Sequence, residues 1–116
     1  MSEILRHKPG PKNCWAVEYG ELVFVAGTQA DDTSVSCKAQ TEEVLKKIDA
    51  YMALAGTNKS KILSANVWVA DIREKAEMDA AWQAWVDPDN KPVCATVESR
   101  LSTPDARVEI MMIAAK

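Results

Sequence analysis

The sequence has a single histidine and only three cysteines, and these four residues are widely separated. Cys14, Cys37 and Cys94 form no CxxC pair, and an odd number of thiols cannot all be paired within one chain. A zinc site needs several His or Cys ligands at short spacings, so we expect no metal and no cofactor. Free thiols are typical of a reducing compartment, which predicts a cytoplasmic protein.

Long apolar runs and an excess of positive charge are also missing. No segment approaches the roughly 20 apolar residues of a membrane span, and residues 1–13 lack the apolar core of a signal peptide. The 14 Lys and Arg residues are outnumbered by 17 Asp and Glu, which gives a net charge of -3. Because nucleic-acid binding needs a basic face, we expect neither nucleic acid nor membrane as a partner.

The chain does contain enough apolar residues for one core. Its 116 residues are 47% hydrophobic and 27% charged, the balance of a single domain that spans 1–116. Apolar residues at strand spacing, bounded by turn residues, predict strands at 4–6, 15–19, 22–26, 62–69, 91–98 and 104–110. Gly20-Glu21 is predicted to be the two-residue turn of a hairpin.

Apolar residues at helical spacing predict two helices. The first begins after one of the possible caps within 31–34, runs to about Ala55, and is followed by Gly56. The second begins within 71–74 and ends at 87–90. Its expected buried stripe consists of Met78, Ala81, Trp82 and Trp85.

The order hairpin, helix, strand, helix, strand, strand predicts an α+β fold with one mixed sheet and both helices packed on one face. The opposite face would then be bare, although Trp68 and Met111 point to it. Burial of a large apolar side chain contributes roughly 1.5–3 kcal/mol. We therefore expect a homo-oligomer with closed symmetry, in which another subunit covers this face.

The two final strands carry polar groups among apolar neighbours. Cys94 and Thr96 share one face of the first strand, and Arg107 and Glu109 share one face of the second. If the two strands are neighbours, these groups could line one pocket. Glu109 is costly to bury unpaired, so it is either a functional carboxylate, a partner of Arg107 or Lys12, or part of an exposed strand face.

Cys94 has two interpretations of its own. It could be a nucleophile or a redox thiol, but the sequence offers it no nearby histidine as a base. The alternative is a small buried apolar residue, which is how a free cysteine usually behaves.

Several segments, taken together, resemble the RidA/YjgF family of small imine and enamine deaminases. They are FVAGT, TEEVLKKIDAYMALAG, SKILSANVWVADI, MDAAWQAWV and RVEIMMIAA, and their order and spacing cover nearly the whole chain. The resemblance implies a chorismate-mutase-like α+β fold, and a homotrimer whose small-molecule clefts lie between subunits.

The resemblance also implies roles for individual residues. In family deaminases a carboxylate on the last strand helps to place the water that attacks the imine carbon, and Glu109 occupies that position. Cys94 stands where those enzymes carry the arginine that binds the substrate carboxylate. The residues expected to hold the substrate are Gly27, Cys94, Ala95, Thr96, Trp15 and Asp79.

The position of Cys94 leaves the activity open. A thiol has fewer donors than a guanidinium, less reach and no fixed charge, so ordinary 2-aminoacrylate or 2-iminobutanoate deamination is in question. Arg100 or Arg107 could take the role. The leading hypothesis is hydrolysis of reactive imines or enamines with release of ammonia. The alternatives are a non-catalytic metabolite-binding or regulatory trimer and, more weakly, an endoribonuclease or translation inhibitor.

Overall fold

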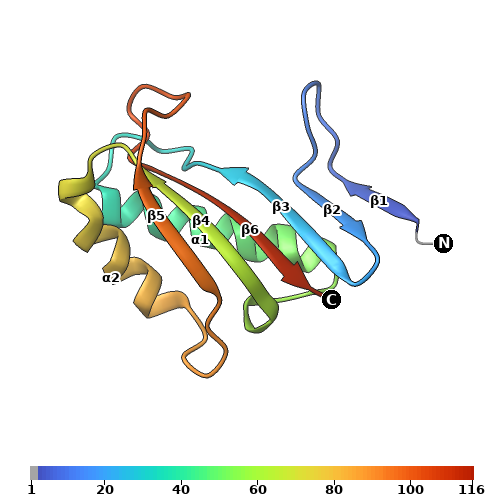
Figure 1. Ribbon diagram of the computed structural model, residues 1–116. Coiled ribbons are helices and arrows are strands. Elements are labelled where there is room, and N and C mark those ends of the chain that lie inside the picture. The colour runs from blue at the N-terminus through green and yellow to red at the C-terminus, as the bar shows by residue number, and fades with distance from the viewer. Residues whose placement is uncertain (1–2) are drawn as a thin grey trace.

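The computed structural model describes residues 3–116, so positions 1 and 2 of the predicted domain lie outside the described range (Figure 1). Six strands form one sheet, and two α-helices pack on one face of it. The elements are β1 (Ile4–His7), β2 (Ala16–Tyr19), β3 (Leu22–Thr28), α1 (Cys37–Leu54), β4 (Ile62–Val69), α2 (Lys75–Trp85), β5 (Val93–Glu98) and β6 (Val108–Ala115). Short 3₁₀ turns, η1 (Lys59–Lys61) and η2 (Ile72–Glu74), precede β4 and α2. The predicted α+β architecture is confirmed.

The strands lie in the order β1-β2-β3-β6-β4-β5, so β4 separates the two final strands. The expectation that these strands are neighbours is wrong. The reason is the connection through α2, which returns the chain to run β5 parallel to β4 at the sheet edge. β6 then pairs antiparallel with the other side of β4 and with β3, which makes it a central strand.

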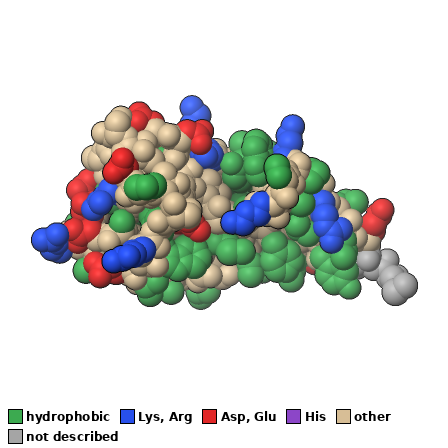
Figure 2. Space-filling view, turned by 90° about the horizontal axis from the view of Figure 1, so that it is seen from above, with side chains coloured by type: hydrophobic (Ala, Val, Ile, Leu, Met, Phe, Trp, Pro, Cys, Tyr) green, Lys and Arg blue, Asp and Glu red, His purple; other side chains and the backbone are tan. Residues whose placement is uncertain are grey.

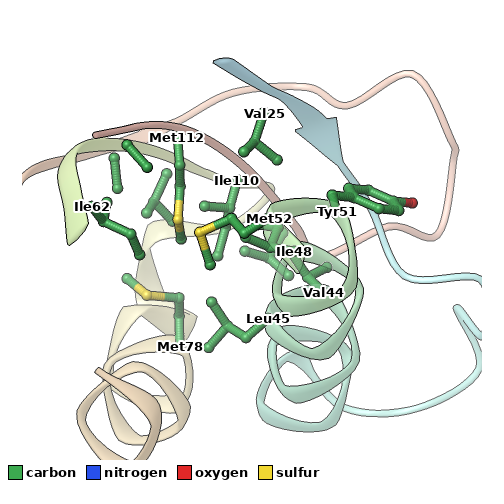
Figure 3. Packing of buried hydrophobic residues seen from close by; sticks show 14 of the residues in the cluster. Val25, Val44, Leu45, Ile48, Tyr51, Met52, Ile62, Met78, Ile110 and Met112 are labelled. Carbon is green, nitrogen blue, oxygen red and sulfur yellow. The ribbon is translucent and has the colours of Figure 1, made fainter. Parts of the chain in front are cut away.

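The core lies between the sheet and the helices. Alternate residues of β3, β4 and β6 point to α1 and α2 and are almost completely buried, as the predicted strand and helix patterns require. Figure 3 shows side chains from both layers meeting there, among them Val25, Ile110 and Met112 from the sheet and Val44, Leu45, Ile48, Met52 and Met78 from the helices.

Several boundaries differ from the predictions: the final strand, predicted at 104–110, is β6 at Val108–Ala115, and α2 begins at Lys75 rather than within 71–74 because the η2 turn comes first. α1 begins at Cys37 rather than after residues 31–34, because Ser36 is the N-cap and its Oγ accepts a hydrogen bond from the Ala39 N–H at 3.2 Å.

Leu63 is 48% exposed, although strict alternation predicts it to be buried with Ala65. The register between β4 and β6 shifts between Ile62 and Ser64, and this irregularity turns Leu63 outward.

The face of the sheet opposite the helices, here called the free face, is apolar. Val97, Trp68 and Glu109 are paired in one row across β5, β4 and β6, so their side chains point to this face. Val93 is 72% exposed and Val97 50% exposed. Figure 2 shows hydrophobic side chains along the lower edge of the molecule, where this face lies. Further apolar residues on the same face are Val17, Tyr19, Leu22, Phe24, Met111 and Ile113.

A buried carboxylate joins the first strand pair to the end of β6. Glu18 of β2 is only 7% exposed. Its Oε1 accepts from Lys116 Nζ at 2.8 Å, and its Oε2 lies 2.6 Å from His7 Nε2 of β1. The hydrogen bonds from Lys116 and then His7 lower the pKa of Glu18, against the opposing effect of desolvation. The ionised form is therefore the one that the fold stabilises.

Replacing Glu18 with glutamine should make the fold less sensitive to acid. Because the folded-state pKa of Glu18 is lower than the pKa of an unfolded glutamate, its stabilising effect is complete above the unfolded-state pKa and is lost as the pH falls through the folded-state pKa. We expect Glu18→Gln to lower the free energy of unfolding by about 1–3 kcal/mol near neutral pH, and by less in acid. Urea titrations across this range test it, with Glu21→Gln on the exposed turn as control. An unchanged pH dependence in Glu18→Gln would contradict it.

Candidate functional site

Glu109 lies on the free face near the start of β6. Its chain neighbours Val108 and Ile110 are fully buried in the core, so the alternation of the strand directs the carboxylate away from the helices. The side chain is half-buried, and Oε1 accepts a hydrogen bond from Gln29 Nε2 at 2.7 Å. Because β6 is paired on both sides, this carboxylate is carried by a well-supported strand.

The second carboxylate oxygen lies against the backbone of Gly27. A Cβ added at Gly27 would be 2.6 Å from Glu109 Oε2, so the carboxylate would have to move to admit it. The backbone of Gly27 is not in the left-handed region, where only Gly20 and Gly56 are found among the described glycines. Gly27 is therefore needed for close approach rather than for a turn. The structure brings these two predicted site residues together.

Gln29 is a site residue that the sequence analysis missed. Its Nε2 also donates to Ser102 Oγ at 3.0 Å. Its backbone carbonyl accepts from Lys47 Nζ at 2.8 Å, and the same Nζ pairs with Asp31 Oδ1 at 2.9 Å. The loop that follows β3 is thus fixed to α1, to the loop before β6 and to Glu109. Gln29 lies in a segment without periodicity, so no local signal marks it.

These residues surround an open cavity of about 520 Å³ at one end of the sheet. A second cavity of about 290 Å³, with a more apolar lining, adjoins it across Asn13, Gly27 and Met111. The larger cavity is lined by Lys12, Asn13, Gly27, Gln29, Ala30, Asp31, Lys47, Ser102, Thr103, Glu109 and Met111. A small ligand could therefore contact the carboxylate, bare backbone and an apolar wall at the same time.

Arg107 does not reach Glu109, which excludes one of the ion pairs considered from the sequence. Its guanidinium binds Glu74 at the end of η2 through two hydrogen bonds of 3.0 and 2.6 Å. This fork raises the pKa of Arg107 above its usual value. Lys12 lines the same cavity as Glu109, but no ion pair joins the two side chains.

Cys94, Thr96 and Asp79 lie at a different place. Cys94 is paired with Ala65, and Thr96 with Val67. Because Ala65 and Val67 are buried against the helices, Cys94 and Thr96 also point to the helix side of the sheet. With Asp79 they line a groove of about 330 Å³ between β5 and α2. The single pocket predicted for the two final strands is wrong within one chain, because Glu109 points to the opposite face.

Cys94 is exposed in a single chain, so the expectation of a buried apolar residue is wrong there, but its environment is not that of an activated thiol either. Desolvation is the largest effect on the Cys94 thiol and raises its pKa, with a smaller contribution from the charge of Asp79. A raised pKa leaves the thiol protonated near neutral pH and weakens it as a nucleophile. Asp79 is paired with Lys75 at 2.6 Å, so the charges in this groove largely balance.

The two other predicted site residues, Trp15 and Ala95, line neither the two adjoining cavities near Glu109 nor the groove of Cys94. The Trp15 ring packs 4.8 Å from the ring of Tyr51 on α1 and is 45% exposed. Ala95 is exposed on the free face of β5, where it is paired with Asn66. Neither residue lines the cavity around Glu109.

The described part of the chain has no cluster of three or more His, Cys, Asp or Glu side chains placed to hold a metal ion. Within the same residues, neither helix has the length and hydropathy to cross a bilayer.

The structure is a small α+β domain in which a sheet carboxylate lies against bare backbone at the wall of an open cavity. Residues 7–116 match the family model described as Endoribonuclease L-PSP, and the chain belongs to this family. A RutC family protein of Haemophilus ducreyi is 41% identical over 97 residues, which cover 84% of this chain and 83% of that protein. A RutC family protein of Haemophilus influenzae is also 41% identical, over 98 residues, 83% of this chain and 84% of the relative.

Solved structures agree with this assignment. A member of the YjgF protein family from Neisseria meningitidis has a TM-score of 0.95 at 34% identity, and covers 98% of this chain and 95% of its own. A YjgF/YER057c/UK114 family member from Mycobacterium tuberculosis has a TM-score of 0.89 at 25% identity, with 98% and 100% covered. The RidA/YjgF membership and fold predicted from the sequence are confirmed.

Adding a methyl group at Gly27 should disturb the carboxylate without unfolding the chain. In Gly27→Ala the new Cβ would meet Glu109 Oε2 at 2.6 Å, and the flexible end of that side chain can move away. We expect the side-chain amide signals of Gln29 to shift in NMR spectra, while the melting temperature changes little. Gly10→Ala is the control, because its Cβ would lie at an ordinary 3.4 Å from the Asn13 carbonyl. Unmoved Gln29 signals in Gly27→Ala would contradict the close approach.

Proposed function

We propose that the cavity around Glu109 hydrolyses small reactive imines or enamines and releases ammonia. The observation that carries this proposal is the placement of the Glu109 carboxylate. One oxygen is held by Gln29 at 2.7 Å, and the other lies over the backbone of Gly27 in an open cavity. A carboxylate that is positioned but not paired with a cation can accept a proton from water.

The chemistry needs only water and a proton acceptor. Water adds to the imine carbon as Glu109 takes one of its protons, and the C=N double bond becomes a single bond. The proton then passes from Glu109 to the nitrogen. The proton of the new hydroxyl group follows it as the C=O double bond forms, so the C–N bond breaks and ammonia leaves a carbonyl product. An enamine enters the same sequence once its carbon is protonated to give the imine. No atom is oxidised or reduced.

We further propose that the working unit is a homotrimer with its clefts between subunits. The apolar free face supports association, since Val93 and Val97 are largely exposed in a single chain. Cys94 and Thr96 point away from Glu109, with β4 between their strands. A site that includes all three must therefore combine two copies, with the β5 edge of one subunit next to the Glu109 cavity of another.

The family description also names an endoribonuclease. We do not favour this activity for the present chain, because its net charge is -3 and one of the two cavity lysines is neutralised by Asp31. RNA binding needs cations that face the phosphates. A non-catalytic metabolite-binding protein is the other alternative, and the kinetic test below distinguishes it.

Glu109→Gln should abolish imine hydrolysis. We expect the wild-type chain to accelerate the decay of 2-iminobutanoate generated in situ, and the variant to lose about 10²-fold or more of that rate, as is typical for a lost general base. The amide keeps the size of the side chain and an acceptor for Gln29. Glu42→Gln, on the exposed surface of α1, is the control. Wild-type chain that binds ligand without accelerating the decay would favour the non-catalytic alternative.

Val97→Asp should disrupt the assembly. A carboxylate at this position would be desolvated if another subunit covers the free face, and harmless if water does. We expect sedimentation to show a trimer of 12.8 kDa chains for the wild type and smaller species for the variant. Val35→Asp makes the same change at a valine that is 38% exposed in the loop before α1, and should leave the trimer intact. A monomeric wild-type chain at micromolar concentration would overturn the trimer proposal.

A further inference from the structure

We propose that Lys12 is the specificity-determining residue of the Glu109 cavity and that it selects ligands with a carboxylate at one end. The inference rests on the proposed function in that it concerns the same cavity. It adds the cation that recognises the ligand, a role that the sequence analysis left to Arg100 or Arg107.

The charges that line the cavity single out Lys12. Four ionisable side chains face it: Lys12, Asp31, Lys47 and Glu109. Lys47 Nζ is occupied by Asp31 at 2.9 Å and by the Gln29 carbonyl at 2.8 Å. No carboxylate of residues 3–116 forms an ion pair with Lys12, and no hydrogen bond engages its ammonium group. Lys12 is thus the cavity cation whose charge is available to a ligand.

The backbone presents Lys12 on an ordered loop. The hairpin loop between β1 and β2 is closed by a hydrogen bond from the Trp15 N–H to the His7 carbonyl at 3.1 Å. Within it, the Gly10 N–H donates to the Asn13 carbonyl at 2.9 Å, with Pro11 and Lys12 between them. Pro11 fixes its own φ and so limits the freedom of the turn. The lysine side chain is flexible, but its attachment point is held at the cavity wall.

Lys12 and Glu109, the two cavity charges that are not paired within the protein, complement a ligand that carries a carboxylate and a positive nitrogen. A small imino acid has a carboxylate at one end and, when protonated, a positive imine nitrogen next to it. Lys12 would take the carboxylate, and Glu109 would lie on the side of the imine and its attacking water. An ammonium is a compact point charge that does not impose the planar fork of a guanidinium, so it tolerates carboxylates in several orientations.

Within one chain, the other candidates for this role are engaged, uncharged or outside the cavity. Arg107 is held by Glu74 through two hydrogen bonds. Arg100 does not line the cavity. Cys94 is a thiol on the opposite face of the sheet and offers no positive charge.

A binding experiment with a stable product analogue tests Lys12 separately from catalysis. Calorimetry would compare 2-oxobutanoate with its neutral amide, 2-oxobutanamide, on wild type, Lys12→Met, Lys12→Arg and Lys8→Met. Methionine keeps the apolar stem and removes the charge. Lys8 belongs to the same hairpin loop but does not line the cavity, which makes Lys8→Met the matched control.

We expect Lys12→Met to weaken 2-oxobutanoate binding about tenfold, as for the loss of one charge-assisted contact. Binding of the amide should not change, Lys12→Arg should restore the affinity, and Lys8→Met should behave as wild type. With an imine substrate, Lys12→Met should raise KM by a similar factor and leave kcat nearly unchanged.

The inference is overturned if Lys12→Met binds 2-oxobutanoate as tightly as wild type, if it loses the amide equally, or if wild type binds no keto acid. Failure of the proposed function looks different. Lys12-dependent binding of the keto acid without imine hydrolysis would retain the role of Lys12 and reject the hydrolase. Imine hydrolysis with an unchanged KM in Lys12→Met would retain the hydrolase and reject the role of Lys12.

Discussion

The alternation of side chains along β6 is the constraint on which the site depends. Val108, Ile110 and Met112 are each at most 1% exposed, and their burial holds the strand between β3 and β4. Glu109 must then point to the opposite face, because a one-residue slip would exchange the two sets. Burial of the hydrophobic core therefore supplies the free energy that fixes the position of the Glu109 carboxylate, and contacts within the site contribute little to it.

A buried amide connects this core to the cavity loops. Gln40 of α1 is 0% exposed, and its Nε2 donates to backbone carbonyls of Thr33, Val35 and Asp105. Its Oε1 accepts from the Arg107 N–H at 2.8 Å. The loops after β3 and before β6 are thus fixed by one satisfied side chain. Gln29 and Ser102, which meet beside Glu109, belong to these two loops, so the polar wall of the cavity is held from within the fold.

The periodic elements could be predicted from residues alone, and the site could be predicted only in part. The β4 range and the core-facing positions of both helices follow from local spacing, although Trp82 and Trp85 of the predicted α2 stripe are only partly buried. The element order implied one sheet with helices on one face. The resemblance indicated Gly27 and Glu109, which do lie together. Alternation does not say which strands pair, so the pocket expected from Cys94 and Glu109 proved wrong for a single chain.

What the residues alone determined is the set of surfaces: which faces of each strand and helix are apolar, and where the chain turns. Those properties are local, because they depend on neighbours two to four positions away. Which polar groups meet was decided by tertiary structure. Gln29 contacts Glu109 across 80 positions and Ser102 across 73, and Lys47 is fixed to the same loop. Such contacts exist only after the core has aligned the strands, because no short-range pattern records the distance between loops that the sheet brings together.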